Sequence, residues 1–322
     1  KKLRGIRNMF MAKMEKIILF GAGKMGKSLY EFLQQRGESE IVACFCDNNA
    51  DLWGQKIGDA EVCSYEACKE KDNKFVITSV AFAAEIEKLL QDDHKEYFAN
   101  IDEWAAQQDF DRVEWNRVSC AWHHIDGMEN YFDIAESTSS MNVFWNKESV
   151  IYKMFCKLDL DNVIELAVGR GRHVQMYEAK ANHIVLVDIL QKNIDFCKER
   201  FKGNEKIAYY CNNGYNLNEL NDNEYSALFT YDAMVHFEMM DVFEYLKDIH
   251  RVLRKGGMAL FHHSNNTSDY KNSFYNAASG RNYMSKDLFA YLAYRAGFEV
   301  LEQQVIDWSV KDLDCVSLVR KN

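Results

Sequence analysis

The stretch Val163-Ile-Glu165-Leu-Ala-Val-Gly169-Arg-Gly171 carries the clearest indication of the fold. It joins a short apolar run, typical of a buried strand, to a turn with two glycines. Glycine lets the backbone turn tightly and pass close to a neighbouring group, because it has no side chain to collide. The stretch therefore predicts a strand with an acidic residue near its end, followed by a tight turn.

Apolar runs recur after this turn at a spacing typical of alternating strands and helices. Strands are predicted at 163–167, 184–187, 207–210, 227–229 and 258–262, and an amphipathic helix at 241–253, which Gly256 and Gly257 stop. This alternation predicts a doubly wound parallel sheet. The last two runs, 298–306 and 315–319, are separated by about eight residues, too few for a crossover, so they are predicted to form an antiparallel hairpin.

The amino-terminal third predicts a smaller unit of the same α/β class. An apolar run, Lys16–Phe20, leads into Gly21-Ala-Gly23-Lys-Met-Gly26, and further elements are predicted as a helix at 27–35, strands at 40–46 and 75–79, and a helix at 81–90. The glycines fit the dinucleotide-binding fingerprint, and Asp47 stands where a ribose-binding acid would. We predict two tandem Rossmann-like domains, a nucleotide-binding type at 1–115 and a second at 116–322, with the junction near 105–120.

The composition is that of a folded protein with two cores. The chain has 322 residues, of which 48% are hydrophobic and 27% charged, which argues against disorder. A net charge of −10 disfavours a nucleic-acid partner. No apolar run is long enough for a membrane span, and the basic segment Lys1–Met14 has no signal-peptide core.

The nine cysteines include no Cys-x-x-Cys pair, so the sequence predicts neither a disulfide framework nor a metal site, and it suits the cytoplasm. Cys44 and Cys46 alternate on a predicted buried strand, where core packing is favoured over a metal or redox role. The chain contains no proline, so a missing proline counts against no motif.

The order of motifs in the second unit resembles the class I S-adenosylmethionine-dependent methyltransferases. After the glycine turn come Asp188, then Asn212-Asn213-Gly214, then an Asp-x-x-x-His pattern from Asp232 to His236, and then Gly256-Gly257. The resemblance spans about 200 residues and implies a seven-stranded methyltransferase sheet that ends in an antiparallel hairpin.

The resemblance also implies which residues bind S-adenosylmethionine. These are Glu165, Gly169, Gly171, Asp188, Asn212 and Asn213. In the family an acid in the position of Asp188 accepts hydrogen bonds from both ribose hydroxyls, and a polar residue in the position of Asn212 or Asn213, more often aspartate, contacts the adenine. The other interpretations are a plain tight turn for the glycines and a helix cap for Asp188.

Methyl transfer to a hydroxyl needs a base, and histidine suits neutral pH. His263, His236 and Asp232 are the predicted catalytic residues, with structural or capping roles as the alternative. Adjacent strand residues point to opposite faces, so only one of His262 and His263 is expected to face the cleft. Tyr131 and Trp145 are expected either to close over the cofactor or to pack in the core.

The acceptor is predicted to be a sugar or another small hydroxylated molecule. The loop 264–285 is rich in polar and aromatic residues that suit such an acceptor, although a solvated loop is the alternative; its members are Tyr270, Tyr275, Arg281 and Tyr283. The amino-methylating signature is absent at 230–233. No nucleic acid or membrane partner is expected, and homo-oligomerisation stays open.

The first unit resembles small Rossmann-like modules found beside sugar-modifying and glycan-assembly enzymes. This likeness implies a nucleotide, NAD or nucleotide-sugar held by Gly21, Gly23, Gly26 and Asp47, or only an assembly surface. Two other functions therefore remain. One is an NAD- or nucleotide-sugar-dependent enzyme that uses this fingerprint, and the other is a non-catalytic binding or scaffold protein.

Overall fold

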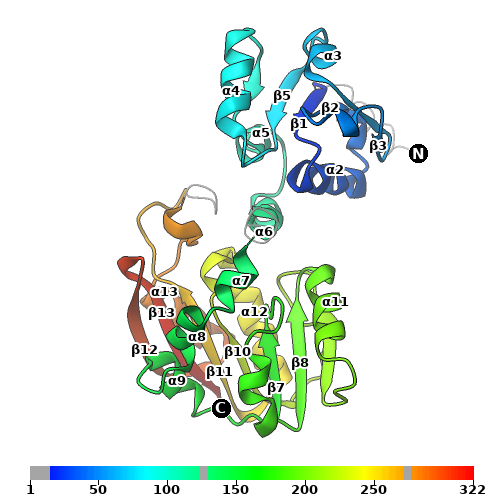
Figure 1. Ribbon diagram of the computed structural model, residues 1–322. Helices are drawn as coiled ribbons and strands as arrows, with labels where there is room; N and C mark the ends of the chain where they lie inside the picture. Colours follow the sequence, from blue (N-terminus) through cyan, green and yellow to red (C-terminus); the bar gives the residue numbers. More distant parts are fainter. Residues whose placement is uncertain (1–14, 124–129, 272–276) are drawn as a thin grey trace, which may run out of the picture. The chain divides into compact units, whose positions relative to one another are not determined.

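The computed structural model describes residues 15–123, 130–271 and 277–322 (Figure 1). Contacts divide the chain into two compact units. The first runs to Asp111 and takes in 122–129, and the second comprises Arg112–Ala121 and the chain from Asn130 onward. The chain thus passes between the units after residues 111, 121 and 129, and the single boundary at 115/116 stays a prediction. Among the described residues no helix is both long enough and apolar enough to span a bilayer.

The first unit is built on a six-stranded sheet with the order β3-β4-β2-β1-β5-β6. Its strands are β1 (Ile17–Phe20), β2 (Val42–Cys46), β3 (Lys56–Ile57), β4 (Ala60–Cys63), β5 (Lys74–Ile77) and β6 (Tyr97–Phe98). Its helices are α2 (Lys24–Arg36), α3 (Tyr65–Lys69), α4 (Ala83–Asp92) and α5 (Ile101–Ala105). The strand β1 pairs in parallel with both β2 and β5, so the strand order reverses there.

The second unit is built on a seven-stranded sheet with the order β12-β13-β11-β10-β7-β8-β9, which confirms the predicted sheet and its antiparallel hairpin. Its strands are β7 (Asn162–Leu166), β8 (His183–Asp188), β9 (Ile207–Cys211), β10 (Tyr225–Thr230), β11 (Leu253–Ser264), β12 (Phe298–Trp308) and β13 (Val310–Lys321). Its helices are α6 (Arg112–Ala121), α7 (Tyr131–Ala135), α8 (Thr138–Trp145), α9 (Val150–Phe155), α10 (Val174–Tyr177), α11 (Gln191–Arg200), α12 (Met239–Val252) and α13 (Lys286–Ala296). Figure 1 shows this sheet with helices along both faces.

Each face of this sheet packs against its own hydrophobic core, because successive side chains of a strand point to opposite faces. Val163 belongs to the core that contains Phe144 and Ile194, from α8 and α11. The next residue, Ile164, belongs to the core that contains Phe289, from α13. The same alternation decides the surroundings of the two histidines at the end of β11.

Several boundaries differ from the prediction, most of all in the carboxy-terminal part of the second sheet. The helix α12 ends at Val252, and Gly256 and Gly257 lie inside the longer strand β11, where Gly256 has a φ of +78°. The hairpin strands are also longer than predicted, and Ser309 alone separates them. Polar residues at the start of β13 hid its length, because they interrupt the apolar run on which the prediction relied.

Candidate functional site

The glycine turn that follows β7 has the backbone conformation that only glycine adopts without strain. The φ angles of Gly169 and Gly171 are +56° and +76°. A Cβ on Gly169 would lie 3.1 Å from a ring carbon of Phe132, and one on Gly171 would lie 2.6 Å from Phe201. Ala167, with a φ of +59°, has the same left-handed conformation despite its side chain.

Asp188, at the end of β8, is joined to this turn. Its Oδ2 accepts a hydrogen bond of 2.8 Å from the backbone N–H of Gly169, and its Oδ1 accepts bonds from the N–H of Leu190 and the side-chain amide of Asn193. Burial raises the pKa of this carboxyl to about 6. Leu190 is the N-cap residue of α11, which has no side-chain cap, so Asp188 braces the turn and the segment that leads into α11 rather than capping the helix.

Asn212, just past the end of β9, has an unused acceptor. Its side-chain amide donates to the hydroxyl of Tyr245 and to the carbonyl of Asn216, and its backbone N–H donates to the carbonyl of Asp188. Its Oδ1 is buried and has no hydrogen-bond partner among the described residues. A buried, unpaired amide oxygen is costly, so it marks a place where a ligand donor would be stabilised.

The side chains of Asn213 and Glu165 make hydrogen bonds within the protein. The Oδ1 of Asn213 accepts from the N–H groups of Tyr215 and Asn216, so this side chain fixes the turn after β9. Glu165 is 3% exposed and accepts a 2.8 Å hydrogen bond from the hydroxyl of Tyr177, inside the core. Burial raises its pKa to about 8. The expectation that Glu165 binds the cofactor is therefore corrected to a structural role.

His263 was expected to be a base, but its surroundings are those of a core residue. It has no exposed surface, and its ring stacks on Phe289 with the ring centroids 3.9 Å apart. Nδ1 lies 2.8 Å from the carbonyl of Ser264 and Nε2 lies 2.8 Å from the hydroxyl of Ser317. Burial also lowers its pKa to about 3. The choice of His263 as the base is therefore corrected to a packing role.

His262 points to the opposite face and belongs to a buried polar chain. Its Nε2 lies 3.0 Å from Asp314, and its Nδ1 accepts a hydrogen bond from the backbone N–H of Asp232. Since Nδ1 accepts, the proton is on Nε2 and is donated to Asp314. His262 is thus a positioning residue for Asp232, a role that the sequence did not reveal.

Asp232 and His236 follow β10. Asp232 has a φ of +56°, and its carboxylate pairs with Arg172 at 3.1 Å. His236 is 4% exposed, and its Nδ1 lies 2.8 Å from the carbonyl of Gly280. A carbonyl can only accept, so Nδ1 carries the proton and Nε2 carries the lone pair in the neutral ring. In this tautomer the basic nitrogen of His236 is Nε2.

Comparison with known families gives the domain type. Residues 164–261 match the family model described as "Methyltransferase domain". The second unit is called the methyltransferase domain below, after this match within it. Residues 13–96 match a different family model, described as "C2185-like, N-terminal". No curated protein matches the sequence.

Several solved structures resemble the methyltransferase domain. An S-adenosylmethionine-dependent methyltransferase from Clostridium acetobutylicum is 16% identical, with 60% of this chain and 98% of that chain covered at a TM-score of 0.46. One from Aquifex aeolicus is 11% identical with the same coverage and TM-score. A putative methyltransferase from Bacillus halodurans is 16% identical, with 53% and 97% covered at a TM-score of 0.43.

Segments before β7 cover the glycine turn of the methyltransferase domain. Besides the contact of Phe132 with Gly169, the guanidinium of Arg170 lies 4.2 Å from the centroid of the Phe132 ring. Burial, and next the charge of Asp232, raise the pKa of Tyr131 to about 12. Trp145 instead stacks on Phe144 and donates its indole N–H to His173 at 2.9 Å. Of the two predicted covering residues, Tyr131 lies on the segment over the turn, and Trp145 is half-buried and packs against the core.

The loop 264–285 of the methyltransferase domain is anchored by Arg281. The guanidinium makes two hydrogen bonds to Asp314, of 2.9 Å and 2.7 Å, and is 3% exposed. The expectation that Arg281 faces an acceptor is therefore corrected: it ties the loop to β13. Tyr270 and Tyr283 are exposed, and Tyr275 lies outside the described residues.

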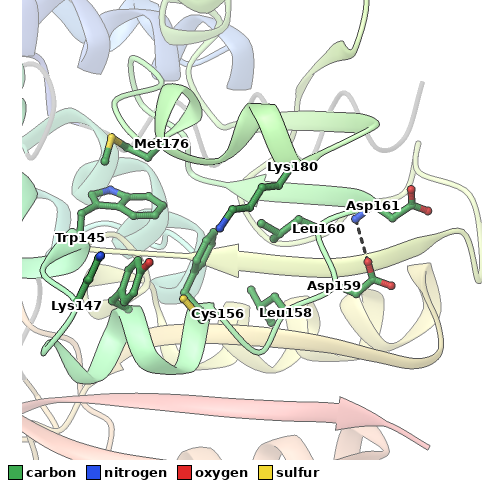
Figure 2. A pocket seen from close by; sticks show the side chains of 11 residues that line it. Trp145, Lys147, Cys156, Leu158, Asp159, Leu160, Asp161, Met176 and Lys180 are labelled. Carbon is green, nitrogen blue, oxygen red and sulfur yellow. Dashed lines mark hydrogen bonds between the residues drawn. The ribbon is translucent and has the colours of Figure 1, made fainter.

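A hollow of about 500 Å³ lies elsewhere on the methyltransferase domain (Figure 2). Its lining includes Asp159 and Asp161, which precede β7, and Lys180, which precedes β8. These residues lie at the amino ends of the parallel strands. Ligands of doubly wound sheets bind at the carboxyl ends, so this hollow is distinct from the site beside the glycine turn.

The glycine turn of the first unit is built like that of the methyltransferase domain. Asp47 accepts hydrogen bonds from the N–H of Ala22 at 2.7 Å and from the N–H of Asn49 at 2.8 Å. A Cβ on Gly26 would lie 2.2 Å from the carbonyl oxygen of Gly21, so only glycine fits, whereas a Cβ on Gly23 would meet nothing within 4 Å. The turn therefore keeps an open side at Gly23.

Proposed function

We propose that this protein is an S-adenosylmethionine-dependent methyltransferase that methylates a hydroxyl group of a sugar or another small hydroxylated acceptor. The observation that carries the proposal is the buried, unpartnered Oδ1 of Asn212 beside Asp188. The exocyclic amine of adenine is the donor that such an oxygen lacks. The family match over residues 164–261 supports the same donor.

The cofactor site fits the residues present. Asp188 accepts hydrogen bonds from Gly169, Leu190 and Asn193 within the protein, and a ribose hydroxyl would add to these donors or replace one of them. The second ribose hydroxyl would replace the amide of Asn193. Gly169 and Gly171 supply the close backbone approach, and Asn212 would accept from the adenine. When bound, S-adenosylmethionine supplies an electrophilic methyl group.

Residues of the protein itself would remove the proton from the acceptor hydroxyl. His236 would take it on Nε2, because the bond from Nδ1 to Gly280 leaves the lone pair there. Asp232 would orient the acceptor or the cofactor, since Arg172 and His262 hold it from two sides. Alignment of donor and acceptor supplies the rest of the rate enhancement.

The test combines donor binding with an acceptor screen. Calorimetric titration with S-adenosylhomocysteine is expected to show one site per chain, and Asp188→Ala is expected to abolish binding. Asp195→Ala, an exposed position on α11, is the matched control and is expected to bind normally. A panel of sugars and small alcohols is then screened for release of S-adenosylhomocysteine. Absence of donor binding to the wild-type protein would overturn the proposal, and binding without turnover on any acceptor would favour a scaffold role.

A second candidate function, nucleotide binding by the first unit, is favoured by the half-buried Asp47 and the open side at Gly23. Thermal-shift measurements with NAD, ADP and a nucleotide-sugar test it, because a ligand of the folded state raises the melting temperature. Asp47→Ala should remove the shift and leave that of S-adenosylmethionine unchanged. No shift with any nucleotide would leave the first turn as a structural element.

A further inference from the structure

Three cysteines from three elements of the first unit converge on one point. Cys44 lies on β2, Cys63 ends β4, and Cys68 lies on α3. Their sulfur atoms all lie within 4.8 Å of one another, and those of Cys44 and Cys68 are 3.7 Å apart. The spacing of these cysteines in the sequence did not predict the group. Its members come together only in the fold, where β2 pairs with β4.

The spacing of the sulfurs matches that around a tetrahedral thiolate-bound metal. A Zn–S bond of about 2.3 Å places two ligand sulfurs of a tetrahedron about 3.8 Å apart. The Cys44 and Cys68 sulfurs already have this separation. A disulfide would need a sulfur–sulfur distance of about 2.0 Å, and it would leave the third thiol without a function in the group.

Charge and access both suit a divalent cation. Three thiolates around such a cation leave one net negative charge, and the ammonium of Lys71 lies 3.5 Å from the sulfur of Cys44, where it would balance that charge and donate to the thiolate. Cys44 and Cys68 are buried, but Cys63 is partly exposed, so the group opens to solvent on its side. A water molecule could there complete four-coordination.

Without a metal the group is a set of neutral thiols. The hydrogen bond shared with Cys68, together with burial, raises the pKa of Cys44, and burial raises that of Cys63. A bound cation reverses this preference, because it stabilises thiolates and releases their protons. Affinity for the metal should therefore rise with pH.

We propose that Cys44, Cys63 and Cys68 form a binding site for a thiophilic divalent cation of the zinc class, with Lys71 as the partner of the Cys44 sulfur. The site lies next to the acid of the first glycine turn, since the backbone N–H of Asp47 donates to the carbonyl of Cys63 at 3.1 Å. Metal binding would consequently stiffen the segment that holds Asp47. The proposal does not depend on the methyltransferase activity.

The test titrates cobalt, a visible probe for zinc sites, into the reduced, metal-free full chain. Sulfur-to-cobalt charge-transfer bands are expected to saturate at one Co²⁺ per chain, and zinc should abolish them and raise the melting temperature. Cys63→Ala, at the partly exposed position, should weaken binding by about 100-fold or more, and Lys71→Met by roughly tenfold. Cys156→Ala removes an exposed cysteine outside the group and should change nothing.

Two results would overturn the proposal. One is the absence of charge-transfer bands in the wild-type protein, or bands that Cys63→Ala leaves unchanged. The other is a reduced protein that binds no cobalt and that, under mild oxidation, forms only a disulfide between Cys44 and Cys68. Mass spectrometry would detect this disulfide. Circular dichroism of Cys63→Ala shows whether a loss of binding reflects a lost ligand or a lost fold.

Discussion

The backbone N–H of Gly169 donates a 2.8 Å hydrogen bond to Asp188, so the glycine turn and the second strand of the methyltransferase domain are fixed to each other. Ala22 and Asp47 repeat the relationship in the first unit at 2.7 Å. In each unit the acid at the end of the second strand braces the turn after the first strand. A ligand that displaced either carboxylate would loosen the turn, whereas one that used a remaining acceptor position would leave it rigid.

Donor binding should depend on pH through Asp188. Burial raises its pKa to about 6, and only the ionised form can accept hydrogen bonds from two hydroxyls. Affinity for S-adenosylhomocysteine is therefore expected to be constant above about pH 7 and to fall by up to about tenfold per unit below pH 6. Calorimetry across this range measures the profile, and an affinity that stays constant down to about pH 5 would contradict the role of Asp188.

Glu165→Gln should change how stability depends on pH. The folded-state pKa of Glu165 is about 8, above its unfolded value, so the folded state holds a proton that the unfolded state releases. Between about pH 4.5 and pH 8 this group lowers the free energy of unfolding by about 1.4 kcal/mol per unit as pH rises. Urea unfolding should show a shallower decline for Glu165→Gln, whereas the exposed control Glu205→Gln should keep the wild-type slope.

Asp314→Ala is expected to cost about 3–5 kcal/mol of stability, because it leaves the buried guanidinium of Arg281 without a counter-charge. Glu302→Ala breaks an exposed pair with Lys157 and should cost less than about 1 kcal/mol. Chemical denaturation compares the two. The hydrogen bonds from His262 and Arg281 outweigh burial and lower the pKa of Asp314, so this stabilisation should persist at neutral pH and be lost only in acid. Equal losses for the two variants would argue against a buried ion pair.

Ala167→Gly should stabilise the methyltransferase domain slightly. Alanine in the left-handed conformation carries a strain of about 1–2 kcal/mol, and glycine removes it at an entropic cost of about 0.5–1 kcal/mol. The expected gain is about 0.5 kcal/mol in the free energy of unfolding. Ala60→Gly, on a strand, should instead destabilise the chain. A loss of stability in Ala167→Gly would show that the methyl group contributes packing that outweighs the strain.

Once an acceptor is found, substitutions of His236 and His263 should have different effects on kcat. His236→Ala is expected to lower kcat by about 100-fold or more with little change in donor affinity, as for the loss of a general base. His263→Ala is expected to cost about 2–4 kcal/mol of stability through the lost contact with Phe289 and to leave kcat near the wild-type value in the folded fraction. Equal kcat in wild type and His236→Ala would show that another group takes the proton.

The sequence predicted both sheets, because the glycine turns and alternating apolar runs depend on local spacing. It missed β3, β4 and β6, which have two to four residues each and are too short to show a clear period. It proposed both His263 and His236 as the base and could not choose between them, since alternation along a strand shows that neighbours oppose each other but not which face each takes. The burial of His263 against Phe289 leaves His236 as the candidate. The group of Cys44, Cys63 and Cys68 was invisible for a similar reason, because its members meet only through the pairing of β2 with β4 and the placing of α3.

The strand β13 lies between β11 and β12, although the ribosome makes it after both of them. Until β13 has been synthesised, one edge of β11 has no backbone partner, and Arg281 lacks its counter-charge Asp314. An open edge of this kind is prone to pair with other chains. Premature termination between β12 and β13 would therefore yield an aggregation-prone fragment rather than a weakened enzyme.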